Sequence, residues 1–248
     1  MDAASSGEGQ AASSSSSSSS APAPAPPPPA LVLYWGSGSP PAWRVLLTLH
    51  EKRLPYRSEL VSFESGQLKK APMLALNPRG LVPILVDGSS GVCMHESLAI
   101  LAYLDQFYPG AAPLLPPDRQ LRARALTRMQ EANNVSSAAG EVVYYVRRTP
   151  PEAIDQVYLA VKRRALSEEM ALWETYIAGA QFLAGPELSL ADLSFFPSLA
   201  YLVRLGFPLE GSFPNLHAYF VRMCGRRSVL DTWPPHWKTV PGLPILKG

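Results

Sequence analysis

The fold is decided at residues 34–45, which read Tyr-Trp-Gly-Ser-Gly-Ser-Pro-Pro-Ala-Trp-Arg-Val. The apolar run from Leu31 to Trp35 predicts a short buried strand. The two glycines predict a turn, and Ser39 followed by Pro40 is typical of a helix start. The sequence therefore presents a serine hydroxyl at the positive end of a helix, directly after a strand, where an anion such as a thiolate is stabilised.

A purely structural helix cap is the alternative interpretation of Ser39. The glycines do not form a dinucleotide fingerprint, because Gly36-x-Gly38 lacks the third glycine, and no phosphate-loop Gly-Lys-Ser/Thr follows. A chemical role for Ser39 therefore depends on residues further along the chain.

The composition of the 248-residue chain excludes several classes of function. The net charge of +2 gives no reason to expect a nucleic-acid partner. Cys93 and Cys224 lack metal or redox spacing, so we expect no metal and a reducing compartment. No apolar run is long enough to span a membrane, and the first residues lack the pattern of a secretory signal. We expect a soluble, cytoplasmic protein.

Four regions follow one another along the chain. Residues 1–30 are rich in Ser, Ala and Pro, which predicts a disordered tail. Residues 31–108 have the order strand, helix, strand, helix, strand, strand, helix, which predicts an α/β domain with a mixed sheet. Residues 109–117 form a Pro- and Ala-rich linker, and 118–248 form an all-α domain. Its predicted helices cover residues 118–147, 151–178, 189–205 and 214–224.

Pro83 interrupts a strand-like run at residues 81–86. A proline cannot donate to a sheet ladder. A cis Val82–Pro83 bond at the start of the strand would leave the Val82 backbone free to hold an extended peptide. An edge strand with a trans proline is the alternative.

Glu96 and Ser97 stand at the start of a predicted helix. The hydroxyl and the first helical amides suit a carboxylate, and Glu96 suits an ammonium group, so together they suit an amino-acid zwitterion. Simple capping is again the alternative.

These motifs together resemble the cytosolic glutathione transferases over residues 31–237. The shared elements are Ser39-Pro-x-x-x-Arg44, Asn77-Pro-x-Gly-x-Val-Pro83 and Glu96-Ser-x-Ala-Ile100. The serine-type rho class is the most similar, through the wording of residues 35–45, Ser189-Leu-Ala-Asp192 and Thr232-Trp-Pro-Pro-x-Trp237. The resemblance implies a thioredoxin-like domain followed by a helical domain, usually as a homodimer.

The resemblance also implies a role for each motif residue toward glutathione. Ser39 would donate its hydroxyl to the glutathione sulfur, with Ser37 as a nearby rival. Val82, before Pro83, would pair with the cysteinyl amide. The γ-glutamyl end would lie at Glu96 and Ser97, and the glycine carboxylate at Lys69 or, by register, equally at Lys70. Lowering the thiol pKa from about 8.5 by two units requires about 2.7 kcal/mol, which is of the order of one hydrogen bond to a charged sulfur beside a helix N-terminus.

A hydrophobic electrophile would bind between the two domains. Met129, Asn133, Ser137 and Tyr144 fall about a helical face apart and are the predicted lining, with core or dimer contacts as the alternative. Trp237, with Trp233, is a possible aromatic flap. Such a pocket is apolar and permissive, so the electrophile is not named by the sequence.

The expected activity is conjugation of the glutathione thiolate to hydrophobic electrophiles, as in detoxification. Reduction of organic hydroperoxides by the same thiolate is one alternative, and a non-catalytic binding or assembly module is another. Mixed-disulfide chemistry is excluded at residue 39, since it is serine where related thiol transferases carry cysteine.

Overall fold

A computed structural model describes residues 30–109 and 113–247. The first half of the chain forms one four-stranded sheet in the order β2-β1-β3-β4. β1 pairs in parallel with β2 and antiparallel with β3, and β3 pairs antiparallel with β4. The strands are β1 (Leu31–Trp35), β2 (Tyr56–Leu60), β3 (Ile84–Asp87) and β4 (Val92–His95). The predicted mixed sheet is confirmed.

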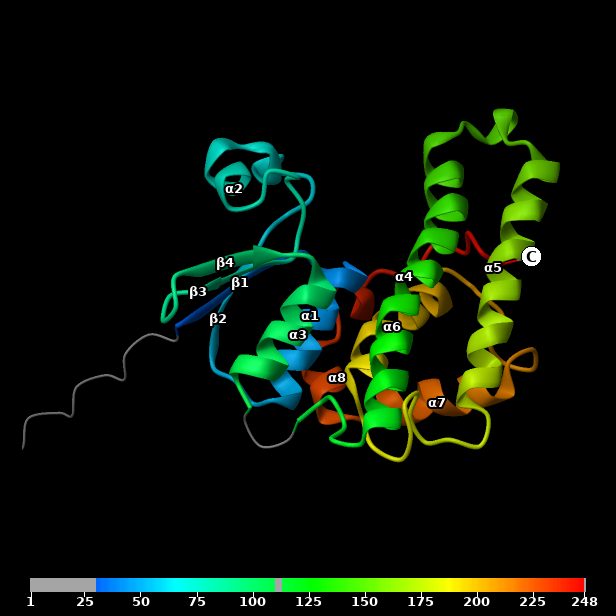
Figure 1. Cartoon of the computed structure of the whole chain (residues 1–248). Helices are drawn as coiled ribbons and strands as arrows, with labels where there is room; N and C mark the ends of the chain where they lie inside the picture. The colour runs from blue at the N-terminus through cyan, green and yellow to red at the C-terminus, as the bar shows by residue number, and fades with distance from the viewer. Residues whose placement is uncertain (1–29, 110–112, 248) are drawn as a thin grey trace, which may run out of the picture.

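Helices cover both faces of this sheet (Figure 1). Because side chains alternate along a strand, Leu33 and Leu85 belong to the main core, which they share with α1 (Pro40–Glu51) and α3 (Ser97–Phe107). Ile84 belongs to a smaller core on the other face, with Met73 of α2 (Ala71–Leu76). A short 3₁₀ helix, η1 (Gln67–Lys69), precedes α2. This arrangement leaves the N-terminus of α1 and the start of α3 at the same edge of the sheet.

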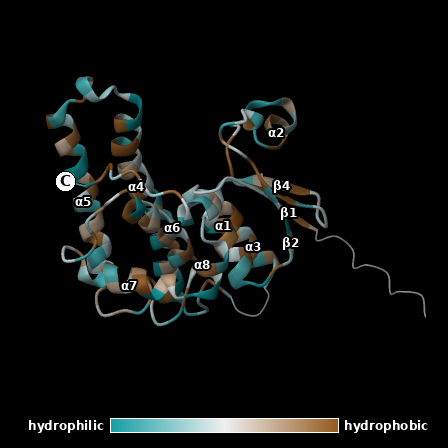
Figure 2. Ribbon diagram, turned by 180° about the vertical axis from the view of Figure 1, so that it is seen from behind, coloured by the Kyte–Doolittle hydropathy of each residue, from teal (hydrophilic) through white to brown (hydrophobic). Residues whose placement is uncertain are grey.

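The second half of the described chain is helical, which confirms the predicted all-α domain. Its helices show hydrophilic and hydrophobic residues alternating along their length, as amphipathic helices do (Figure 2). The exception is α6, which is buried almost throughout. The elements are α4 (Arg119–Arg148), η2 (Pro151–Ala153), α5 (Gln156–Ile177), α6 (Leu190–Arg204), α7 (Pro214–Cys224), α8 (Arg227–Thr232) and η3 (Pro235–Lys238).

A buried carboxylate fixes the start of α6. Asp192 Oδ2 accepts from the Ser189 N–H at 2.9 Å, and Oδ1 accepts from the Leu183 N–H at 2.9 Å. Burial raises the pKa of Asp192 to about 6 although these hydrogen bonds favour its charged form. Ser189 and Asp192 therefore form a capping box at the start of α6, the helix that docks against α1.

Polar contacts hold the linker and the C-terminal segment in place. Lys52, directly after α1, and Asp105 of α3 form a buried ion pair at 3.0 Å, and the same carboxylate accepts from the Leu114 and Leu115 N–H groups of the linker. Residues 233–247, the C-terminal segment, run back over α6, where Arg204 donates to the Val240 carbonyl at 2.7 Å. The predicted tail lies outside the described residues except for Ala30, as do three residues of the predicted linker, and the domain boundaries remain predictions.

Candidate active site

Ser39 caps the N-terminus of α1, as its place before Pro40 predicts. The Ser39 N–H donates to the Gly36 carbonyl at 3.1 Å and closes the turn. Its hydroxyl accepts from the Ala42 N–H at 3.4 Å, and the side chain is half-buried. This hydrogen bond uses only a lone pair, so the hydroxyl proton of Ser39 is left to donate elsewhere.

The turn that carries Ser39 is held from outside by the C-terminal segment. Ser37 Oγ lies 2.7 Å from Nδ1 of His236. Gly38 has φ +78°, and a Cβ atom there would lie 2.9 Å from Nε1 of Trp237, so glycine is required by both conformation and space. The backbone around Ser39 is thus fixed on both sides.

Arg44 connects the first domain to the second from the buried face of α1. It is 1% exposed and donates to the Ser194 carbonyl at 2.7 Å and to Asn133 Oδ1 at 2.9 Å. It also reaches Ser97 Oγ at 3.3 Å. Burial lowers the pKa of Arg44 to about 10, so the guanidinium stays charged at neutral pH. One side chain therefore links α1, α3, α4 and α6 beneath the cavity described next.

A cavity of about 380 Å³, here called the Pro83 cavity, opens above Arg44. It contains four of the residues predicted to bind glutathione, Val82, Pro83, Glu96 and Ser97, and it also contains Asn133, which was predicted for the second substrate. Its full lining is Pro41, Arg44, Asn77, Arg79, Leu81, Val82, Pro83, Glu96, Ser97, Leu98, Ala99, Gln130 and Asn133. Ser39 is not in this lining, but it lies two residues before Pro41.

One wall of the Pro83 cavity is the loop before β3. The Val82–Pro83 bond is cis, so of the two alternatives for Pro83 the cis form is confirmed. Asn77 is buried and holds the loop, donating from Nδ2 to the Leu81 carbonyl at 2.9 Å and accepting the Arg79 N–H at 3.0 Å. The backbone of Val82 is presented by this loop outside the regular ladder of the sheet.

The opposite wall is the start of α3. Glu96 has φ +74°, a left-handed conformation that is unfavourable for a residue with a side chain. Such strain costs of order 1–3 kcal/mol and persists where the surrounding structure enforces it, frequently at functional sites. Here it turns Glu96 toward the mouth of the Pro83 cavity, where the exposed side chain lies 3.9 Å from Arg79. Ser97 begins the helix, whose first amides have no carbonyl partner within the helix, and its hydroxyl accepts from Arg44.

Lys69 lies apart from the cavity lining. Its ammonium group donates to the Arg79 carbonyl at 2.9 Å, and it packs against Gly80, where φ is +59°. Lys69 therefore supports the loop that carries Arg79. The choice between Lys69 and Lys70 stays open.

A second, smaller cavity of about 140 Å³ lies on the other side of Pro41 and is called the Pro40 cavity. Of the predicted electrophile residues it contains Tyr144. It is lined by Pro40, Pro41, Ser136, Ala139, Gly140, Val143, Tyr144, Ser198 and Tyr201. Because Pro41 lines both cavities, they meet at the N-terminus of α1, beside Ser39.

The remaining predicted residues lie elsewhere on or near α4. Met129 is 3% exposed and belongs to the main core. Ser137 faces α5, in a groove considered below. Trp237 packs edge-on against Trp43 at 5.5 Å and stacks with Tyr201 at 6.2 Å, so it stands behind the wall of the Pro40 cavity.

Sequence reasoning did not list Arg44, Asn77, Arg79 and Gln130 as site residues. Arg44 and Asn77 stood inside the quoted motifs, so the motif spacing was the available signal. Gln130 comes from α4 and approaches only because the domains dock, and no local pattern marks it. Within residues 30–109 and 113–247, no group of three or more His, Cys, Asp or Glu side chains is placed to hold a metal ion. No helix in those ranges combines the length and hydropathy needed to cross a bilayer.

Comparison with known proteins agrees with this fold. Residues 33–112 match the family model "Glutathione S-transferase, N-terminal domain", and residues 138–227 match "Glutathione S-transferase, C-terminal domain". A protein of Pleuronectes platessa named glutathione S-transferase A is 38% identical over 88% of this chain and 97% of its own length. The crystal structure of a glutathione S-transferase from the Antarctic clam Laternula elliptica has a TM-score of 0.81 at 40% identity, covering 88% of this chain and 98% of that one. A Methylobacillus flagellatus glutathione S-transferase structure with bound glutathione has a TM-score of 0.73 at 25% identity, covering 82% and 99%.

A thioredoxin-like domain with a cis-proline cavity, followed by an all-α domain, defines a transferase of the glutathione-dependent type. The chain belongs to the glutathione S-transferase family.

Proposed function

We propose that this chain joins the thiolate of glutathione to hydrophobic electrophiles, with Ser39 as the hydrogen-bond donor to the sulfur. The observation that carries the proposal is the Pro83 cavity, which brings Val82, Glu96 and Ser97 together beside the turn of Ser39. The Pro40 cavity is adjacent, so a sulfur near Ser39 and an electrophile among apolar side chains are neighbours.

Each part of glutathione has a complementary group in this arrangement. The γ-glutamyl carboxylate suits Ser97 and the amides at the start of α3, and the ammonium group suits Glu96. The cysteinyl amide suits the free backbone of Val82. For the glycine carboxylate we propose Arg79, exposed at the rim of the cavity, and Lys69 or Lys70 as the cationic partners.

The chemical step needs a thiolate and no histidine base. The hydroxyl proton of Ser39 stabilises the negative sulfur, and the N-terminus of α1 adds its partial positive charge. The sulfur then forms a bond to the electrophilic carbon, and the leaving group, for example chloride, departs with the bonding electron pair.

Several finer assignments belong to the same proposal. The serine at position 39 and the motifs shared with the rho class support a serine-type enzyme of that class. Family membership supports a homodimer, and Leu126 on α4 and Leu81 beside the Pro83 cavity are exposed apolar residues that a second copy would cover. The two free cysteines support a cytoplasmic enzyme of xenobiotic detoxification.

The test is Ser39→Ala, with Ser37→Ala as the matched control in the same turn. For Ser39→Ala, the kcat for conjugation of chlorodinitrobenzene should fall on the order of 100-fold. This is the size of effect expected when an active site loses one hydrogen-bond donor to a negatively charged atom. The pKa of the bound thiol, followed by thiolate absorbance, should rise by about one to two units. The cap loss should cost about 1 kcal/mol of stability.

Unchanged turnover and thiol pKa in Ser39→Ala, or an equal loss in Ser37→Ala, would reject the role of Ser39. Absence of heat on injecting glutathione into the folded wild-type protein would reject the activity itself. Turnover of cumene hydroperoxide without any aryl halide conjugation would assign hydroperoxide reduction instead.

A further inference from the structure

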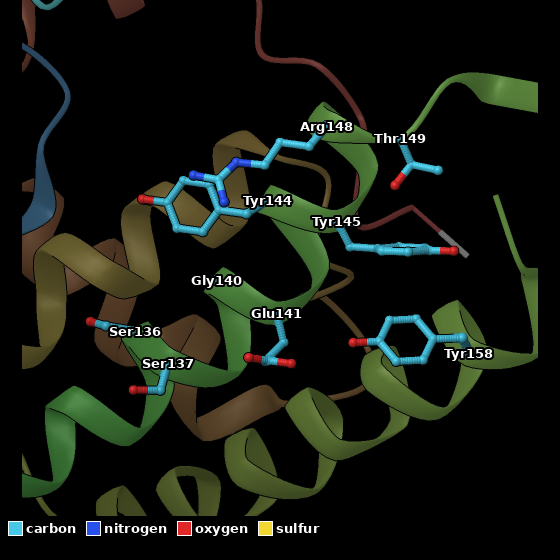
Figure 3. A pocket seen from close by; sticks show the side chains of 9 residues that line it. All are labelled: Ser136, Ser137, Gly140, Glu141, Tyr144, Tyr145, Arg148, Thr149 and Tyr158. Atoms are coloured by element: carbon cyan, nitrogen blue, oxygen red, sulfur yellow. The ribbon is translucent and has the colours of Figure 1, made fainter. Parts of the chain in front are cut away.

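A groove of about 560 Å³ runs between α4 and the start of α5. The two helices stand apart here, below the connection through η2 (Figure 1). The lining residues are Ser136, Ser137, Gly140, Glu141, Tyr144, Tyr145, Arg148, Thr149 and Tyr158, shown as sticks in Figure 3. We call it the α4–α5 groove.

The α4–α5 groove is continuous with the Pro40 cavity. Ser136, Gly140 and Tyr144 line both of them. Gly140 contributes no side chain to the shared wall, and Tyr144, which is 57% exposed, borders both spaces. A molecule that begins in the Pro40 cavity therefore has a continuous path along α4 into the groove.

The walls of the groove are aromatic. The rings of Tyr145 and Tyr158 lie 4.6 Å apart at an angle of 54°, across the groove from Tyr144 (Figure 3). Tyr145 is anchored, since its hydroxyl accepts from the Asp155 N–H at 2.8 Å. Tyrosines present flat apolar surface with a polar tip, which suits a planar ring that carries polar groups.

The charge in the groove is positive. Glu141, its one acidic lining residue, is paired with Lys162 of α5 at 3.1 Å. Arg148 lies over the ring of Tyr144, 5.0 Å from the centroid, and within the described chain no carboxylate forms an ion pair with it. Arg148 therefore places an uncompensated guanidinium beside Tyr144, and a guanidinium is the group best suited to a carboxylate.

The position of Arg148 sets the shape of the ligand. Arg148 lines the α4–α5 groove and not the Pro40 cavity, and its guanidinium lies beside Tyr144, which lines both. A ligand that reacts in the Pro40 cavity and reaches Arg148 must therefore extend past Tyr144, with its anionic group away from the reacting carbon.

We propose that the preferred electrophiles of this enzyme are elongated aromatic molecules that carry a carboxylate remote from the reacting carbon, and that Arg148 selects them. The inference rests on the proposed function and concerns its second substrate. Compact neutral electrophiles fill only the Pro40 cavity, whereas a remote carboxylate adds the aromatic and cationic contacts of the groove.

The test compares ethacrynic acid with its methyl ester, which share one reacting centre and differ in the remote charge. In both, the thiolate sulfur bonds to the terminal methylene carbon, the double-bond electrons move to the ketone as an enolate, and the α-carbon takes a proton from water. The measured quantity is the ratio of kcat/KM for the acid to that for the ester. Because this ratio compares one enzyme with itself, it is insensitive to partial loss of folded protein.

Arg148→Ala should lower this ratio roughly threefold to tenfold, in the range of a partly exposed ion pair or charge-assisted hydrogen bond. Arg148→Lys should retain part of the preference for the acid over the methyl ester. Added salt should lower the wild-type ratio toward that of Arg148→Ala. Arg164→Ala, which removes an exposed arginine of α5 already paired with Glu168, is the matched control and should leave the ratio unchanged.

An equal ratio in wild type and Arg148→Ala, with both compounds conjugated, overturns the inference and leaves the proposed function standing. A fall in Arg164→Ala as large as in Arg148→Ala also overturns it, because the effect is then one of net charge. Conjugation of neither compound by the wild-type protein rejects the proposed function, and the inference with it.

Discussion

The two sides of the site are built differently. The base of the Pro83 cavity is made of immobilised groups, whereas Glu96 and Arg79 at its rim have largely exposed side chains. Arg44, Asn77 and Ser97 are 1%, 2% and 7% exposed and are held by hydrogen bonds. The Pro40 cavity and the α4–α5 groove are bordered by exposed side chains such as Tyr144 and Arg148. A rigid wall loses no rotamer freedom when its ligand binds, whereas a flexible one adapts to several shapes at an entropic cost. The comparison teaches that the side proposed for glutathione, the constant substrate, is the more rigid one, and the side proposed for the variable electrophile is the more adaptable one.

The largest expected effect comes from removing the rigid support. Arg44→Ala leaves the Ser194 carbonyl and Asn133 without their buried donor and creates a cavity between the domains. The free energy of unfolding should fall by about 3 kcal/mol or more, measured by urea denaturation. Arg148→Ala removes an arginine from the adaptable side and should change stability by no more than about 0.5 kcal/mol. Similar losses of unfolding free energy in the two variants would contradict the distinction between a rigid side and an adaptable side.

An intermediate effect is expected on glutathione affinity, which distinguishes the Pro83 cavity from the Pro40 cavity. Ser97→Ala removes a hydroxyl proposed to bind the γ-glutamyl carboxylate and should weaken glutathione binding about tenfold. The advantage of glutathione over Cys-Gly, measured by calorimetry, should shrink in proportion. Ser198→Ala removes a hydroxyl that is 3% exposed in the Pro40 cavity and serves as the control. Weaker glutathione binding by Ser198→Ala than by Ser97→Ala would contradict the assignment.

The smallest effect is expected at Gly140, where stability and substrate room oppose each other. A methyl group there would meet the Tyr144 ring at 3.5 Å, an ordinary contact. Gly140→Ala should therefore stabilise the helix by about 0.5–1 kcal/mol and narrow the adaptable side. We expect the KM for the methyl ester of ethacrynic acid to rise about twofold, and we expect the affinity for glutathione to stay the same. A fall in melting temperature would show that the shared wall has no room for a methyl group.

Local signals predicted the fold well. β1 and α7 have the predicted bounds, Leu31–Trp35 and Pro214–Cys224, because apolar pattern, turn residues and proline coincide at their ends. The strand expected at residues 81–86 begins only at Ile84, since the chain before it forms the cis-proline loop. α8 (Arg227–Thr232) was not predicted, because six residues are too short to show a helical period.

The predicted site residues show the same difference between local signals and the effects of tertiary packing. Val82, Glu96 and Ser97 meet in one cavity and were indicated by contiguous motifs of the first domain. Helical spacing along α4 was a weaker guide, because this helix is covered on several sides. Met129 faces the core, while Tyr144 borders both the Pro40 cavity and the α4–α5 groove. Which face of a long helix meets which neighbour is decided by domain docking, which a periodic pattern does not contain.

The bracing of the Ser39 turn by His236 and Trp237 has a consequence for biosynthesis. The turn leaves the ribosome early, whereas the residues that brace it are made nearly two hundred positions later. Until then Trp43 lacks two of its edge-on aromatic partners, Trp233 and Trp237. The nascent first domain therefore carries a Trp43 indole without these partners, and the Ser39 turn gains its brace only once residues 233–237 have been made.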